Sequence, residues 1–178
     1  MKKMIGILAS LFALTAQAAL KPGEAAPDFT TQASLGGNEF SFSLSQALKY
    51  GPVVLYFYPA AFTKICTIEA HAFAEAVDQY KALGATVIGV SHDPIETLKK
   101  FSVSECRSKF PVAADGDQSI SKSYDAVLAA KPEYADRTSY VIVPGSKIIY
   151  SFTDMMHPEK HVENTLDALR TWKAEQKQ

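Results

Sequence analysis

The chain has 178 residues, which is the length of one ordinary domain, and 47% of them are hydrophobic, enough to bury a core. Nine glycines and nine prolines exclude a collagen-like or disordered chain, and a formal net charge of -1 argues against non-specific nucleic-acid binding, which needs a basic surface. Two cysteines are too few for a disulfide scaffold or a zinc site built mainly of thiolates, so each thiol has to be interpreted individually.

The first eighteen residues have the three parts of a secretory signal peptide. Lys2 and Lys3 form the positive segment, an apolar run covers 4–14, and Ala16-Gln17-Ala18 is a small-x-small cleavage site. The run is about half as long as a membrane-spanning helix, which favours cleavage over an uncleaved signal anchor. Loss of both lysines leaves 16 basic against 19 acidic residues over 19–178, a formal charge of -3. We therefore expect export to an oxidising compartment, the bacterial periplasm.

The first part of the exported chain predicts little regular structure. Residues 21–38 are rich in Gly, Pro and polar residues, and predict a loosely ordered segment with one short strand. Phe40, Phe42 and Leu44 alternate with serines, which is typical of a short edge strand or of the lead into a turn of helix. The apolar run Val53–Tyr58 then predicts a strand covered on both faces, as in the centre of a parallel sheet.

Two helices with a buried strand between them are predicted next. A helix is expected over Thr63–Leu83, with Gly84 closing it, and Thr86–Val90 is the second buried strand. The following helix is expected to start at Asp93-Pro94, because proline suits the first helical turn, and to run to about Arg107.

The last third of the chain predicts short elements and a final helix. In chain order they are a short strand after 109–112, a turn at 115–117, a short helix over Ser119–Val127, a hairpin of Ser139–Val143 with Lys147–Phe152, and a helix from Pro158. Val162, Leu166, Leu169 and Trp172 lie on one face of that last helix. The order of elements predicts an α/β fold of thioredoxin-like order, with a central mixed sheet flanked by helices, in one domain over 19–178.

Cys66 is the residue that suggests chemistry, because it falls in the first turn of a helix that follows a central strand. The unpaired backbone N–H groups and the positive end of the helix dipole favour a thiolate there, and the thiolate is the nucleophilic form. Thr63 lies one helical turn before Cys66, so its hydroxyl can share a pocket with the sulfur. Pro59 removes a donor and stiffens the loop. The alternative is an inert core cysteine at a helix start.

The pattern Pro59-x-x-x-Thr63-x-x-Cys66 resembles the active-site motif of the peroxiredoxins, thioredoxin-fold peroxidases that use a cysteine. Gly23–Phe29 is similar to the N-terminal segment of that family, and Cys66–Glu69 is similar to the peroxiredoxin Q (bacterioferritin comigratory protein) branch. Arg137 occupies the place of the family's active-site arginine, although an arginine is otherwise more often solvated. The resemblance spans most of the exported chain.

The resemblance implies a thiol-dependent peroxidase that reduces hydrogen peroxide and organic hydroperoxides. Cys66 would become a sulfenic acid, with Arg137 stabilising the thiolate and the breaking O–O bond, and with Thr63 and a backbone N–H orienting the peroxide. Glu69 would tie down the arginine or act as a helix cap. A thioredoxin-like protein would be the reductant of a monomer or homodimer. Neither a cofactor, a metal nor nucleic acid is implied.

The sequence departs from the family at the second thiol. Many peroxiredoxin Q members have another cysteine five residues after the first, and here that residue is His71. Cys106 is the other thiol and is a possible resolving cysteine. Twelve residues beyond Pro94, it would lie about 18 Å along its helix, toward the opposite edge of the sheet, whereas a disulfide needs Cα atoms within about 7 Å. Resolution by Cys106, which would then need local unfolding, and a one-cysteine cycle with an external thiol both stay open.

Two other functions compete with the peroxidase. A thioredoxin-like disulfide reductase needs Cys-x-x-Cys, and this chain has threonine at position 63 in place of the first cysteine. A non-enzymatic thiol- or metal-binding module could use His157 and His161, which are four residues apart. Because Pro158 sets the helix boundary between them, a solvated pair of histidines is the simpler expectation.

Overall fold

The computed structural model describes residues 19–177. The signal peptide expected over 1–18 lies outside the described residues. Within the described part of the chain, no helix has both the length and the apolar character that a membrane span requires.

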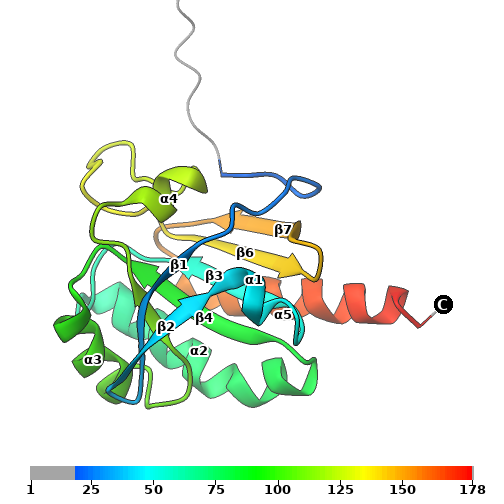
Figure 1. Cartoon of the computed structure of the whole chain (residues 1–178), viewed down its shortest axis with the longest axis horizontal. Coiled ribbons are helices and arrows are strands. Elements are labelled where there is room, and N and C mark those ends of the chain that lie inside the picture. Colours follow the sequence, from blue (N-terminus) through cyan, green and yellow to red (C-terminus); the bar gives the residue numbers. More distant parts are fainter. Residues whose placement is uncertain (1–18, 178) are drawn as a thin grey trace, which may run out of the picture.

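A seven-stranded mixed sheet forms the centre of the fold (Figure 1). Its strands are β1 (Thr30–Leu35), β2 (Asn38–Ser43), β3 (Val53–Phe57), β4 (Thr86–Ser91), β5 (Val112–Ala114), β6 (Thr138–Val143) and β7 (Lys147–Thr153). They lie in the order β2-β1-β5-β4-β3-β6-β7. Strands β3, β4 and β5 are parallel, whereas β6, β7, β1 and β2 pair antiparallel with their neighbours. The mixed sheet expected from the sequence is confirmed.

Helices cover both faces of this sheet, as Figure 1 shows. They are α1 (Leu44–Ala47), α2 (Lys64–Ala82), α3 (Ile95–Ser104), α4 (Ser119–Ser123) and α5 (Pro158–Glu175). The side chains of α2, α3 and α5 pack into one hydrophobic cluster, and those of α1 and α4 pack into a second cluster on the other face. Val162, Leu166 and Leu169 are the buried members of the predicted face of α5, and Trp172 is half-buried.

Strand β3 is the buried central strand that the sequence predicts. All five of its residues are buried, because alternate side chains enter the clusters on opposite faces of the sheet. Tyr56 lies over Gly89 of the neighbouring strand, and a Cβ at Gly89 would come within 2.6 Å of the tyrosine ring. A glycine is therefore required there for the ring to pack flat against the sheet.

Residues 30–43 form a two-stranded hairpin, paired from Thr30 with Ser43 to Leu35 with Asn38. Its strands are the short strand expected within 21–38 and the edge strand expected around Phe40 and Phe42. Two helices end earlier than the sequence predicts. Helix α3 ends at Ser104 rather than near Arg107, since Arg107 and Ser108 adopt left-handed backbone angles that cannot continue a helix. Helix α4 ends at Ser123, two residues before Asp125, which is also left-handed.

The sheet register brings distant parts of the chain to one edge. Because β3 and β4 are parallel, their carboxyl ends lie side by side, and the loop from β3 to α2 starts at that edge. Strand β6 runs antiparallel to β3 and pairs Thr138 with Phe57, the last residue of β3. Arg137, which directly precedes Thr138, is thereby delivered to the same edge as the start of α2.

Candidate active site

The loop between β3 and α2 is fixed at both ends. The Tyr58 backbone N–H donates to the carbonyl of Val90 at 3.1 Å. The Ala61 N–H donates to the carboxylate of Asp93 at 2.7 Å, and the Ser91 hydroxyl donates to the same carboxylate oxygen at 2.8 Å. The loop is therefore held against the end of β4. Asp93 was visible in the sequence as the residue that follows the second strand, but its link to this loop was not.

Cys66 occupies the first turn of α2, as the sequence predicts. Phe62 turns the chain with a left-handed φ of 63°, and Thr63 caps the helix in an extended conformation. Cys66 is only 2% exposed. Its sulfur is not enclosed by hydrocarbon alone, because Nη2 of Arg137 donates to Sγ of Cys66 at 3.3 Å. A guanidinium at hydrogen-bond distance favours negative charge on the sulfur.

Arg137 is a buried residue and not a solvated one, with 1% of its surface exposed. Nε of Arg137 donates to the carbonyl of Met155 at 3.2 Å, and Nη1 donates to Oε2 of Glu69. Burial alone would lower the pKa of Arg137, but the nearby Glu69 and Cys66 outweigh burial and raise it. The guanidinium is therefore a permanent cation whose donors are aimed by three separate groups.

Glu69 is fully buried one turn after Cys66 on α2, where it ties down Arg137. Burial raises the pKa of Glu69 to about 8, although Arg137 acts in the opposite direction. Its second oxygen, Oε1, has no hydrogen-bond partner within residues 19–177. One guanidinium thus serves two acidic groups, the carboxyl of Glu69 and the thiol of Cys66.

Thr63 and Pro59 lie in the loop beside this cluster. Thr63 is exposed, and its hydroxyl donates to the carbonyl of Ala60 at 3.0 Å. Among the described residues this hydroxyl makes no hydrogen bond to Cys66, so the shared pocket expected from the sequence stays a prediction. Pro59 is half-buried, two residues after the end of the central strand.

The second thiol has a different environment. Cys106 lies beyond the end of α3 and is fully buried, in the same hydrophobic cluster as Cys66. Burial raises the pKa of the Cys106 thiol, and Glu105 adds to the effect. No cation is hydrogen-bonded to it among the residues described, so Cys106 is the less reactive thiol in this conformation.

The segment that carries Cys106 contacts α2, and its expected position toward the opposite edge of the sheet stays a prediction. Oε2 of Glu105, the residue before Cys106, lies at hydrogen-bond distance, 2.8 Å, from Nε2 of His71. His71 lies five residues beyond Cys66 on α2, about 7.5 Å along the helix axis. The Cys106 segment therefore packs against the first half of α2. Both cysteines are free thiols.

The expectation of a solvated histidine pair is wrong for His161. His157 is exposed and pairs with Asp154, but His161 is fully buried. Nδ1 of His161 lies 2.8 Å from the hydroxyl of Ser139, and Nε2 lies 2.9 Å from the carbonyl of Asp154. Neither ring nitrogen is free to bind a metal. In the described part of the chain, no three potential ligands of the Cys, His, Asp or Glu types come together.

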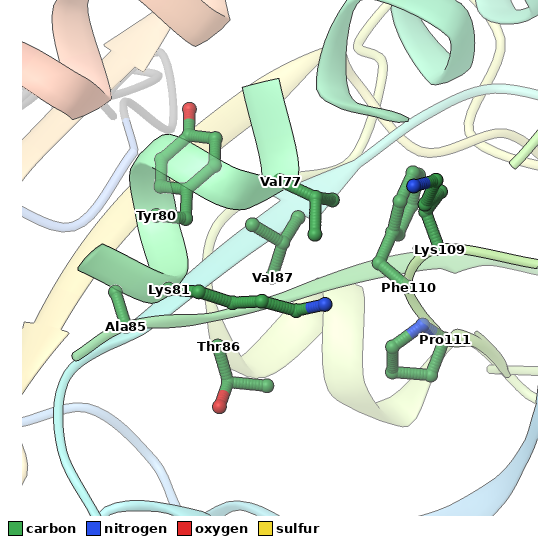
Figure 2. A pocket seen from close by; sticks show the side chains of 9 residues that line it. All are labelled: Val77, Tyr80, Lys81, Ala85, Thr86, Val87, Lys109, Phe110 and Pro111. Carbon is green, nitrogen blue, oxygen red and sulfur yellow. The ribbon is translucent and has the colours of Figure 1, made fainter. Parts of the chain in front are cut away.

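A hollow elsewhere in the molecule is separate from this cluster (Figure 2). It lies between the last turns of α2 and the start of β4, where Lys81 and Lys109 flank an apolar floor that includes Val87. Lys81 is fifteen residues after Cys66, about 22 Å along the helix. None of the predicted site residues lines this hollow.

Comparisons with known proteins agree with the geometry. Residues 22–151 match the AhpC/TSA family. The chloroplastic peroxiredoxin Q of Oryza sativa subsp. japonica is 33% identical over 149 residues, which cover 84% of this chain and 66% of that protein. The chain thus spans just under two thirds of that relative's length. The chloroplastic peroxiredoxin Q of Sedum lineare is 31% identical over 151 residues, covering 85% of this chain and 78% of that protein.

A solved structure is similar over almost its whole length. The crystal structure of peroxidoxin BcpB from Mycobacterium tuberculosis superposes with a TM-score of 0.78 at 28% identity, covering 85% of this chain and 97% of that chain. The reduced 2-Cys peroxiredoxin of Plasmodium vivax has the same TM-score, 0.78, at 23% identity, which shows the fold alone. The thioredoxin-like fold expected from the sequence is confirmed.

Proposed function

Because the chain belongs to the AhpC/TSA family, we propose that it is a thiol-dependent peroxidase with Cys66 as the nucleophile that attacks peroxide. Its peroxiredoxin Q relatives and the BcpB structure support this activity. The single observation that carries the assignment of Cys66 is the contact of 3.3 Å from Nη2 of Arg137 to its sulfur. Cys106 lacks such a contact and is therefore not the attacking thiol.

The reaction is a two-electron oxidation of the sulfur. The Cys66 thiolate attacks one oxygen of the peroxide, the S–O bond forms, and the O–O bond breaks. The departing oxygen takes a proton and leaves as water or an alcohol, so that thiol plus hydroperoxide becomes sulfenic acid plus alcohol. Hydrogen peroxide and organic hydroperoxides both satisfy this balance.

Arg137 stabilises the charge of this step. Its Nη2 holds the thiolate before the attack and then faces the oxygen on which charge develops. Glu69 and the Met155 carbonyl keep the guanidinium in position, so little reorganisation accompanies the reaction. Thr63, at the start of the same helix, orients the peroxide with its hydroxyl, and Pro59 stiffens the loop that carries it.

The sulfenic acid returns to the thiol in one of two ways. Cys106 attacks it to form a disulfide and release water, or an external thiol attacks it directly. The packing of the Cys106 segment against α2 favours the first route, whereas the burial of both thiols means that this segment must open first. In either route, a thioredoxin-like protein supplies the electrons.

The competing functions have less support. A disulfide reductase would need a second thiol at position 63, where the chain has threonine. A metal-binding module would need a free nitrogen on His161, and both of its nitrogens are engaged. A peroxidase is the function that uses the observed arrangement of Cys66, Arg137 and Glu69.

Two single variants test the assignment. Cys66→Ser should abolish peroxide consumption with the fold intact, and Cys106→Ser should still consume one equivalent of hydrogen peroxide per chain. Mass spectrometry under non-reducing conditions would then find a sulfenic acid at Cys66 in the Cys106→Ser protein. Peroxide consumption by the Cys66→Ser protein would overturn the assignment. A wild-type product with Cys106 still free would remove the intramolecular route.

We also propose that residues 1–18 direct export and that 19–178 form the peroxidase domain in the periplasm. The motivation is the signal-peptide pattern of the sequence. Cell fractionation and N-terminal sequencing should yield a periplasmic chain that begins at Ala19. Because cytosolic thioredoxin cannot reach that compartment, a periplasmic thioredoxin-like donor should reduce the oxidised protein. Reduction by cytosolic donors alone would contradict this location.

A further inference from the structure

His161 is a buried polar residue that has no role in the reaction proposed above. It belongs to α5, and none of its surface is exposed. Its ring packs edge-on against Phe152 of β7, with 4.9 Å between the ring centres. A fully buried imidazole needs partners for both nitrogens, and the identity of those partners indicates what the residue does.

The hydrogen bonds of His161 fix its protonation state. The carbonyl of Asp154, 2.9 Å from Nε2, can only accept, so Nε2 carries the proton. Burial lowers the pKa of His161 to about 4, so the ring is neutral at pH 7 and Nδ1 has no proton. The Ser139 hydroxyl, 2.8 Å from Nδ1, is therefore the donor in that bond.

The two groups that His161 holds are the supports of Arg137. The Asp154 backbone N–H donates to the carbonyl of Arg137 at 3.2 Å, and the next carbonyl, that of Met155, accepts from Arg137 Nε at 3.2 Å. Ser139 follows Arg137 by two residues on β6. A single imidazole thus joins the strand that directly follows the arginine to the turn that aims its side chain.

Neutrality of the ring matters because Glu69 is close. Oε1 of Glu69, the oxygen without a hydrogen-bond partner, lies 3.9 Å from Nδ1 of His161. A charged imidazole there would place a second cation beside the Glu69 carboxyl group and would repel the guanidinium. With a neutral His161 ring, Arg137 is the one cation within the described residues that pairs with Glu69.

We propose that His161 is a positioning residue of the peroxidase, which fixes the Asp154–Met155 turn and thereby aims Arg137 Nη2 at Cys66. The proposal rests on the proposed function for the roles of Arg137 and Cys66. It assigns no contact between His161 and the peroxide. If this is so, the N–H donor at the Nε2 position of His161 determines how strongly Arg137 stabilises the Cys66 thiolate.

Three substitutions separate positioning from simple core packing. His161→Gln keeps an N–H donor near the Nε2 position, His161→Asn has the same amide on a chain too short to reach the Asp154 carbonyl, and His161→Leu has no donor. Each is made in a Cys106→Ser background, so that Cys66 is the single thiol. The rate of alkylation of Cys66 by iodoacetamide from pH 5 to 9 and the rate constant with hydrogen peroxide are then measured.

We expect the glutamine protein to stay within about three-fold of the parent in both rates. The asparagine and leucine proteins should lose about 10²-fold in the peroxide rate, the loss that a small misplacement of a catalytic group causes. Their alkylation profiles should move to higher pH. A merely structural role would lower the melting temperature without moving the alkylation profile of the folded protein.

Equal rates for the glutamine and asparagine proteins would overturn the proposal, and this comparison stands even where the leucine variant does not fold. Alkylation needs no peroxide, so it tests the proposal independently of the peroxidase assignment. Peroxide consumption by Cys66→Ser would remove the proposed function, whereas an unchanged alkylation profile in His161→Asn would remove the role of His161.

Discussion

Nη2 of Arg137 lies 3.3 Å from Sγ of Cys66, although 71 residues separate the two in sequence. The sheet explains this contact, because Thr138 pairs with Phe57 and so delivers Arg137 to the edge where α2 begins. The contact distinguishes the two buried thiols of this chain. One has a cation at hydrogen-bond distance, and the other is surrounded by apolar side chains and Glu105.

Replacement of Arg137 should slow the peroxide step without removing the nucleophile. Arg137→Ala should lower the rate constant for hydrogen peroxide about 10²–10³-fold, the loss typical of a missing donor at a developing charge. Arg137→Lys should fall between, because lysine keeps the charge but not the rigid pair of donors. Stopped-flow measurement gives these rates, with circular dichroism as the control for folding. A wild-type rate in the alanine protein would exclude the assigned role.

Thr63 should act through its hydroxyl and not through its shape. Thr63→Val keeps the branched side chain and removes the donor, so the peroxide step should slow about 10²-fold. Thr63→Ser is the matched control, since it keeps the hydroxyl and should stay within about five-fold of wild type by the same argument. If valine and serine were equally active, the hydroxyl would have no part in binding peroxide.

Glu69 should make the protein less stable as the pH rises. Its folded-state pKa of about 8 lies above the ordinary 4.5, so between these values the folded protein holds a proton that the unfolded chain has lost. The contribution of Glu69 to the free energy of unfolding should therefore fall from pH 4.5 to 8, by an amount of the order of a few kcal/mol.

Urea denaturation of Glu69→Gln at pH 5 and pH 8 measures this effect. Glutamine does not titrate, so the variant should lose much less stability between these two pH values than wild type does. The exposed Glu159→Gln should behave as wild type does. The same pH dependence in all three proteins would contradict the buried ionisation of Glu69.

His161 should make the protein sensitive to acid. Its folded-state pKa of about 4 lies below the ordinary 6.5, so between these values the unfolded chain binds a proton that the folded protein does not. The contribution of His161 to the free energy of unfolding should fall by about 1.4 kcal/mol per pH unit as the pH drops from 6.5 toward 4, in the direction opposite to the contribution of Glu69. His161→Gln should lack this slope in urea denaturation curves, and an equal slope in both proteins would contradict it.

Two ion pairs on α2 should control how readily Cys106 reaches Cys66. His71 pairs with Glu105 at 2.8 Å, and Glu75 pairs with Arg107 at 3.1 Å, on either side of Cys106. Because these pairs are partly exposed, each contributes at most about 1 kcal/mol, and His71→Ala or Glu75→Ala should speed disulfide formation about two- to five-fold.

Quenched-flow sampling with mass analysis after one equivalent of peroxide follows that disulfide. Lys160→Ala removes an exposed ion pair on α5 and is the control that should leave the rate unchanged. A slower disulfide in the His71 and Glu75 variants would mean that these ion pairs assist the approach of Cys106 instead of restraining it.

Local sequence patterns were sufficient for most of the architecture. The run Val53–Tyr58 predicts a buried central strand because every residue is apolar, and the proline and glycine signals place the helices that follow. The motif around Cys66 also predicted the candidate nucleophile and the loop that precedes it. Predictions failed where a tertiary contact or a left-handed residue decides the outcome, as at Arg107 and Ser108, which end α3 early.

The sequence by itself determined the strand-to-helix position of Cys66, because helix starts and apolar strands are local properties of the chain. Only the tertiary structure decided which groups surround that sulfur. Arg137 comes from the antiparallel pairing of β6 with β3, and His161 comes from the packing of α5 behind Glu69. Whether a histidine or an arginine is solvated or buried depends on long-range packing, and a local pattern of residue types does not contain that information.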